Sequence, residues 1–338
     1  MTPAISAVFT IIAVALVFDY INGFHDAANS IATVVSTRVL SPRLAVLWAT
    51  VFNFLALFIF QQGVANTISK IVAIDPSQSG AFTWVVISGL AGAIVWNLLT
   101  WWWGLPSSSS HALIGGLSGA GIAYAGWHVL NTDKLYPTLE WIILAPMLGL
   151  VLGGIIMFVV YWLFRRMRPT KVDRVFRVGQ LFSAAAYSLG HGGNDAQKTV
   201  GVIWAVMVAG GMMPATSHSA PYWAIIASYT AMAAGTALGG QRIIKTMGMG
   251  ITSLKPVGGF CANLAGAITL FGATGLHVPV STTHTITGAI VGVGSVTKVR
   301  GIRWGLATRI VYAWIFTIPA AGLVGAGVLY LARALHAF

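Results

Sequence analysis

One short polar motif occurs twice in this chain, each time inside a run of residues that is otherwise strongly apolar. The first copy is NGFHDAANS (22–30), and the second copy, HGGNDAQKT (191–199), follows it at an offset of 169 residues. A second pair of motifs, PSSSSH (106–111) and PVSTTH (279–284), repeats in the same order at nearly the same offset. The chain therefore contains two related halves. Polar interruptions of both halves are typical of the central site of a transporter.

The composition indicates a membrane protein. Hydrophobic residues make up 57% of the 338 residues and charged residues only 8%, whereas soluble domains carry about 25% charged residues. With about 20 apolar residues per span, hydropathy predicts ten segments. They lie near 4–35, 43–62, 81–103, 106–128 and 139–164 in the first half, and near 178–212, 221–241, 256–275, 277–296 and 304–334 in the second. We expect an all-α integral membrane protein.

Five segments in each half place the two halves in opposite orientations across the bilayer. The basic residues test this arrangement, because Lys and Arg accumulate in cytoplasmic loops. With residues 165–177 in the cytoplasm, fourteen basic side chains lie inside and three outside. The inside set is Arg38, Arg43, Arg165, Arg166, Arg168, Lys171, Arg174, Arg177, Arg242, Lys245, Lys255, Lys298, Arg300 and Arg303; the outside set is Lys70, Lys134 and Arg333.

The predicted domains are a first membrane repeat (1–164), a basic cytoplasmic linker (165–177) and a second, inverted repeat (178–338), with both termini outside. The loop positions of the basic residues argue against nucleic-acid binding, despite a net charge of +12. Segments 4–35 and 178–212 are longer than one span, so we expect broken or strongly bent helices there.

Three carboxylates lie at membrane depth: Asp19, Asp26 and Asp195. Each costs about 2.5–3.5 kcal/mol there unless it is paired or solvated. Because Asp26 and Asp195 are duplicates, we predict that they bind a coupling cation or carry a proton. The alternative is a structural ion pair between Asp195 and Lys198, which share a helix face. Asp19 aligns with Ser188 and lacks a second copy.

Amide side chains flank the duplicated carboxylates. Amide oxygens, with carbonyls freed at a helix break, can bind Na⁺, and amide N–H groups can bind phosphate oxygens. The alternative is ordinary hydrogen bonding between helices. The predicted coupling-ion residues are Asp26, Asp195, Asn22 and Asn194, and Asn29, Gln197 and Lys198 are predicted to contact the substrate.

The Ser/Thr-rich motifs predict an anion site. Proline is favoured in the first turn of a helix, so Pro106 and Pro279 are expected to start helices within the membrane. Hydroxyls then gather around unpaired N–H groups at the positive end of each helix dipole. The alternative is N-capping without a ligand. The hydroxyl residues predicted to bind substrate are Ser108, Ser109, Ser110, Ser281, Thr282 and Thr283.

The paired NGFHDAANS and GHGGNDAQKT motifs, together with both Pro-x-Ser-[Ser/Thr]-[Ser/Thr]-His motifs, resemble the signatures of inorganic phosphate transporters of the PiT family. The resemblance covers nearly the whole chain. It implies symport of inorganic phosphate with Na⁺ or H⁺ through an inverted repeat that contains re-entrant helical hairpins. The Phe-His-Asp and Gln-Lys variants resemble the bacterial low-affinity branch, in which proton coupling and metal–phosphate substrates are typical.

The sequence thus predicts a secondary transporter in the bacterial plasma (inner) membrane that imports phosphate, alone or with a divalent metal, with H⁺ favoured over Na⁺. No cofactor, catalytic residue or structural metal is expected, and the lone Cys261 excludes an intramolecular disulfide. The partners are phosphate and the lipid bilayer, and a homodimer is left open. The alternatives are a sulfate symporter of the same fold, a passive channel, and a membrane-embedded hydrolase with Ser110 or Ser108 as nucleophile.

Overall fold

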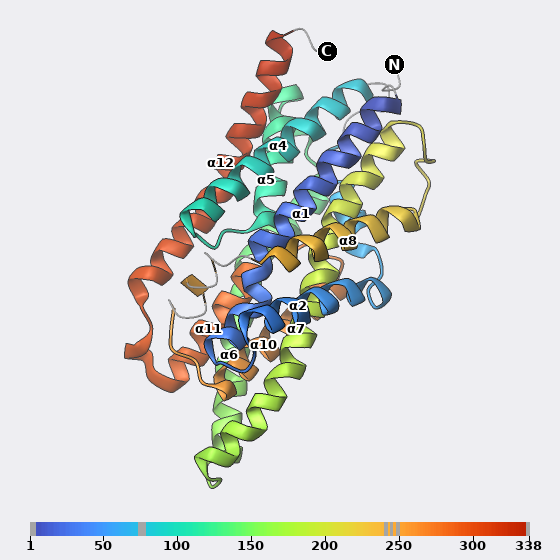
Figure 1. Ribbon diagram of the computed structural model, residues 1–338. Helices are drawn as coiled ribbons and strands as arrows, with labels where there is room; N and C mark the ends of the chain where they lie inside the picture. Colours follow the sequence, from blue (N-terminus) through green and yellow to red (C-terminus); the bar gives the residue numbers. More distant parts are fainter. Residues whose placement is uncertain (1–4, 74–78, 240–242, 244–245, 248–250, 336–338) are drawn as a thin grey trace.

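The computed structural model describes residues 5–73, 79–239, 243, 246–247 and 251–335, and the regular elements in these ranges are helices (Figure 1). The first half contains α1 (Ile5–Ser36), α2 (Pro42–Leu55), α3 (Gly63–Ile68), α4 (Ser79–Trp103), α5 (Ser109–Ala125) and α6 (Thr132–Phe164). The second half contains α7 (Pro169–Ala209), α8 (Tyr222–Leu238), α10 (Pro256–Gly275), α11 (Thr282–Lys298) and α12 (Trp304–Ala334). The prediction of an all-α fold is confirmed.

Several of these helices are suited to a bilayer. Among the described residues, α1, α4, α6, α10 and α12 are long and apolar enough to cross a membrane. The chain is therefore a multi-pass membrane protein. The segment predicted at 43–62 is divided into α2, a 3₁₀ turn at Ala56–Phe58 and the start of α3. The predicted limits at residue 4 and residues 240–241 lie outside the described ranges.

We expected broken or strongly bent helices over segments 4–35 and 178–212, and the expectation of a break is wrong. Helix α1 runs unbroken over 32 residues and α7 over 41 residues. The motif glycines permit close packing instead of a break. A Cβ atom at Gly23 would lie 2.2 Å from the carbonyl oxygen of Met232 on α8, and one at Gly192 would lie 2.3 Å from that of Asn53 on α2. The backbone carbonyls of these motifs therefore stay in the helices.

The predicted basic linker is also largely helical. Helix α6 ends at Phe164 and α7 begins at Pro169, where proline suits the first helical turn. Within this segment Arg177 pairs with Asp173 at 2.8 Å and donates a hydrogen bond to the carbonyl oxygen of Arg38 at 3.0 Å. Two groups of residues predicted to be cytoplasmic therefore lie together. Arg242 and Lys245 lie outside the described residues.

Corresponding helices of the two halves make corresponding contacts. Helix α5 packs on α12 as α11 packs on α6, and α1 packs on α8 as α7 packs on α2. The second helix of each hairpin therefore packs against the last helix of the other half. Helix α1 begins and α12 ends at one end of the molecule, and the α6–α7 turn lies at the opposite end (Figure 1). The inverted orientation and the repeat boundaries stay predictions.

Two helical hairpins, α4–α5 and α10–α11, bring their tips together inside the protein. The hydroxyl of Ser110 donates to the carbonyl oxygen of Val280 at 3.0 Å, and the rings of His111 and His284 lie 4.4 Å apart between centroids. All four residues are buried. The two Ser/Thr-rich motifs therefore meet at one place, as re-entrant hairpins require.

Glycine allows the α6–α11 pair to approach closely. A Cβ atom at Gly288 would lie 2.1 Å from the carbonyl oxygen of Pro146, and one at Gly292 would lie 2.0 Å from that of Leu150. Such small-residue contacts are the usual means of close helix packing in membranes.

Substitution of Gly292 by alanine should lower stability, because the added methyl group must force α11 away from α6. We expect a loss of about 1–3 kcal/mol in the free energy of unfolding, measured by thermal denaturation of purified protein in detergent. Gly327→Ala on α12 is the matched control, since a Cβ atom there meets nothing within 4 Å. Equal melting temperatures for the two variants would contradict this packing.

Candidate substrate and ion site

The duplicated carboxylates lie in one buried cluster. Helices α1 and α7 bring ligand atoms of Asp26, His191 and Asp195 within 4.8 Å of one another. The three side chains are at most 2% exposed. Two carboxylates and an imidazole at this spacing can hold a proton or a small cation between them. The two copies of the polar motif thus contribute to the same place.

Lys198 connects this cluster to both hairpin tips. Its ammonium group contacts the Asp195 carboxylate and the Ser110 hydroxyl, and it donates to the carbonyl oxygen of Val280 at 2.9 Å. The ion pair between Asp195 and Lys198 that sequence analysis offered as the structural alternative is therefore present. The pair is buried, so both charges depend on each other and on these hydrogen bonds.

Asp26 is held by a second network that reaches the α4–α5 hairpin. His25 Nδ1 lies 2.7 Å from a carboxylate oxygen of Asp26, and His25 Nε2 lies 3.0 Å from the Thr100 hydroxyl. The Ser107 hydroxyl donates to Thr100 at 2.8 Å. Neither Thr100 nor Ser107 was among the predicted site residues. Thr100 lies in an apolar span, and only the His25 contact distinguishes it from a packing residue.

The first turn of α11 contacts residues of both polar motifs. The Thr282 hydroxyl donates to Asp195 at 3.2 Å, and the Asn29 amide donates to the hydroxyls of Thr282 and Thr283 at 3.2 and 2.9 Å. Tyr187 donates to the carbonyl oxygen of Thr282 at 2.9 Å. Asn29, Thr282, Thr283, Ser110 and Lys198 are thus brought together with the aspartates, whereas nothing in the sequence singled out Tyr187.

Ser108 and Ser281 are N-caps. Their hydroxyls accept hydrogen bonds from the backbone N–H groups of His111 and His284 at 3.3 and 3.2 Å. The expectation that Pro106 and Pro279 start helices is wrong, because α5 and α11 begin three residues later, directly after the capping serines.

The capping alternative therefore accounts for two of the six hydroxyl residues. The hydroxyl of Ser109 is buried and has no hydrogen-bond partner among the described residues. It is free to bind a ligand at the start of α5.

Asn194 and Gln197 have other contacts. The Asn194 amide donates to Thr274 at 3.0 Å and to the carbonyl oxygen of Val278 at 3.2 Å, and its oxygen accepts from the N–H of Val280. It therefore fixes the tip of the α10–α11 hairpin. Gln197 accepts hydrogen bonds from the N–H groups of Val64 and Ala65, at the start of α3.

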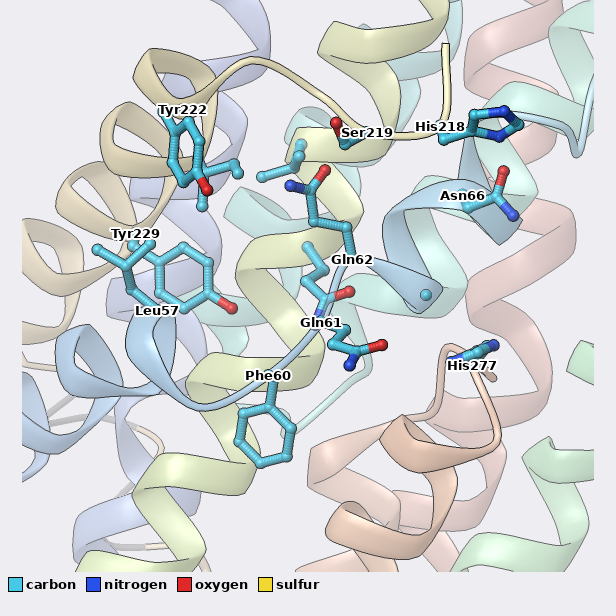
Figure 2. A pocket seen from close by; sticks show the side chains of 14 residues that line it. Leu57, Phe60, Gln61, Gln62, Asn66, His218, Ser219, Tyr222, Tyr229 and His277 are labelled. Carbon is cyan, nitrogen blue, oxygen red and sulfur yellow. The ribbon is translucent and has the colours of Figure 1, made fainter. Parts of the chain in front are cut away.

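Gln197 also lines a cavity of about 480 Å³. Figure 2 shows polar and aromatic side chains around it, among them Gln62, Tyr229 and His277. Tyr222 on its wall is 82% exposed, so the cavity reaches the protein surface. Gln197 is next to Lys198 in α7, and it is the residue of the polar motif that lines this cavity.

Loss of the Lys198 charge should destabilise the protein, since Asp195 would be left as a buried, unpaired carboxylate. We expect Lys198→Met to lower the free energy of unfolding by about 3–5 kcal/mol, and Asp195→Asn/Lys198→Met to recover most of that loss. Thermal denaturation of wild type, Asp195→Asn, Lys198→Met and the double variant in detergent measures this coupling. A double variant as unstable as the sum of the single variants would exclude a coupled pair.

Comparisons with known proteins identify the family of this chain. The profile of the Phosphate transporter family matches residues 22–325. A protein of Rhizobium meliloti (strain 1021) named "Probable low-affinity inorganic phosphate transporter" is 53% identical over 317 residues, which cover 94% of this chain and 93% of the relative. A Bacillus subtilis (strain 168) protein of the same name is 44% identical over 316 residues, which cover 94% of each chain.

A solved structure, "The sodium-dependent phosphate transporter", has the same fold. It matches with a TM-score of 0.89 and 23% identity over 98% of this chain and 100% of that chain. These proteins are transporters and not enzymes, so the hydrolase alternative is set aside. With the family profile extending from the first polar motif almost to the end of α12, this chain belongs to the phosphate transporter family.

Proposed function

We propose that this protein imports inorganic phosphate by symport with a cation, with H⁺ favoured over Na⁺. The observation that carries the proposal is the buried cluster of Asp26, His191, Asp195 and Lys198 beside the two hairpin tips. It combines cation-binding carboxylates with hydroxyl and ammonium donors for an oxyanion. Placement in the bacterial plasma (inner) membrane, with both termini outside, is part of the proposal.

Phosphate in this proposal binds between the hairpin tips. The N-terminal turns of α5 and α11 supply hydroxyls and the positive ends of two helix dipoles. Ser109, whose hydroxyl has no partner among the described residues, is the first candidate ligand. Lys198 and the hydroxyls of Thr282 and Thr283 would exchange their present contacts for phosphate oxygens.

Charge balance requires a cation to accompany the phosphate. With both aspartates ionised, Asp26, Asp195 and Lys198 carry one net negative charge, and a phosphate anion adds at least one more. Burying this excess negative charge is costly in a medium of low dielectric constant. A proton suits the carboxylate–imidazole contacts of His25 and His191. A divalent metal bound to phosphate would cancel the same charge, so a metal–phosphate complex is the second proposed substrate form.

Uptake of labelled phosphate into proteoliposomes tests the carboxylates. An inward H⁺ gradient should drive accumulation in wild type and a protonophore should abolish it, and we expect Asp26→Asn and Asp195→Asn to lose about tenfold or more in rate. Asp173→Asn is the control, because Asp173 lies in an exposed ion pair outside the site. Normal gradient-driven uptake by both site variants would refute their role. Separate arms with a Na⁺ gradient and with excess sulfate test the coupling ion and the anion.

Ser109 offers a test of phosphate contact that does not disturb the protein. Because its hydroxyl makes no hydrogen bond within the described residues, Ser109→Ala should leave the melting temperature unchanged. We expect the KM for phosphate to rise about tenfold, which corresponds to about 1.4 kcal/mol for a hydrogen bond to a charged group. An unchanged KM would remove Ser109 from the substrate site.

A further inference from the structure

Asp19 is a buried carboxylate that the central cluster does not use. It lies on α1, seven residues before Asp26, and its side chain is 0% exposed. Neither of its oxygens reaches hydrogen-bond geometry with any described residue. Buried polar atoms nearly always have partners, and an unpaired carboxylate in the membrane is especially costly. A group that compensates the buried Asp19 carboxylate is therefore expected.

Two further buried oxygens without a hydrogen bond to a described residue lie next to Asp19. The side chains of Asn22 on α1 and Thr199 on α7 lie against its carboxylate. The amide oxygen of Asn22 and the hydroxyl of Thr199 are both buried and without a hydrogen bond to any described residue. Carboxylate, amide and hydroxyl oxygens thus gather at one point between α1 and α7, and the carboxylate and amide oxygens are acceptors only.

The charged groups around Asp19 do not neutralise it. Those within electrostatic range are Asp195 and Lys198 of α7. Lys198 is already bound to Asp195, Ser110 and Val280, and Asp195 adds charge of the same sign. From α8, the titratable side chain close to Asp19 is the phenol of Tyr229.

We propose that Asp19, Asn22 and Thr199 form a second binding site for a monovalent cation, separate from the Asp26–Asp195 cluster. One positive charge between these oxygens neutralises the carboxylate and satisfies the Asn22 oxygen. Oxygen ligands of these three kinds suit Na⁺, and a proton on Asp19 would donate to the same amide oxygen. The inference rests on the proposed symport, to which it adds a second coupling cation.

The other half of the protein lacks this site. By the offset of the duplicated motif, Asp19, Asn22 and Thr199 correspond to Ser188, His191 and Ser30. There the Ser30 hydroxyl and His191 Nδ1 lie 3.3 Å apart, and no carboxylate is part of the set. The second site is therefore a single one, and Ser188, equally buried, provides a matched control position.

The phenol of Tyr229 lies within electrostatic range of Asp19. Tyr229 also lines the 480 Å³ cavity (Figure 2). In the proposal, a cation reaches Asp19 from this cavity.

The test is the number of cations moved per phosphate, obtained from proteoliposomes as the cation gradient that balances a fixed phosphate gradient. We expect this ratio to fall by one in Asp19→Asn and to stay at the wild-type value in Ser188→Ala. Phosphate exchange at equal concentrations on both sides, which needs no net cation flux, should persist in Asp19→Asn. A wild-type ratio in Asp19→Asn would overturn the second site.

Two further measurements keep the outcome decisive. Thr199→Val retains the carboxylate and removes one ligand, so the cation concentration for half-maximal uptake should rise about tenfold; an unchanged value would overturn the site even if Asp19→Asn fails to fold. Titration of Na⁺ at fixed pH, and of pH with choline in place of Na⁺, identifies the ion. Absence of phosphate exchange in wild type would instead refute the proposed function.

Discussion

The contacts of one buried ammonium group hold the central region together. Lys198 binds a carboxylate of its own helix, a hydroxyl at the tip of α4–α5 and a carbonyl at the tip of α10–α11. In a medium of low dielectric constant, neither Lys198 nor Asp195 is stable without the other. If phosphate binds between the tips as proposed, it would compete for Lys198 with the Ser110 hydroxyl and the Val280 carbonyl, one at each hairpin tip.

Glycine residues in the two polar motifs allow the neighbouring helices to pack closely around this cluster. Helix α8 packs against α1 at Gly23, and α2 packs against α7 at Gly192. Both close contacts therefore lie beside the polar residues of the motifs. The long helices can then remain unbroken while they bring Asp26 and Asp195 within 4.8 Å of each other. Rigid helices fix the charged groups, and the hairpin tips supply the exchangeable donors.

Much of this arrangement follows from the duplicated motifs and the hydropathy. The all-α fold, the approach of Asp26 to Asp195 and the convergence of the Ser-rich motifs were all predictable, because a repeat places equivalent residues at equivalent depths. The unbroken helices were not predictable. A glycine in a polar motif is compatible both with a helix break and with close packing, and only the position of Met232 or Asn53 decides between them.

Asn194, Gln197 and Ser108 make the contacts that the sequence left open as alternatives: ordinary hydrogen bonds for the two amides and N-capping for Ser108. Each satisfies a backbone group at a loop or helix start, and for Asn194 and Gln197 that partner is remote in sequence. Thr100 gave no signal, since a single Thr hydroxyl in an apolar helix usually bonds to its own backbone. Tyr187 gave none either, because a lone tyrosine in an apolar span has the same sequence pattern as a packing residue.

The central claim is that one phosphate is held between the two hairpin tips. Its most direct test uses the single native cysteine: with Cys261 replaced by alanine, Ser109→Cys and Thr283→Cys are each exposed to a small thiol reagent. Phosphate should slow the labelling of both positions with the same half-maximal concentration, and sulfate should be much less effective. Protection at only one tip, or at neither, would contradict a shared site.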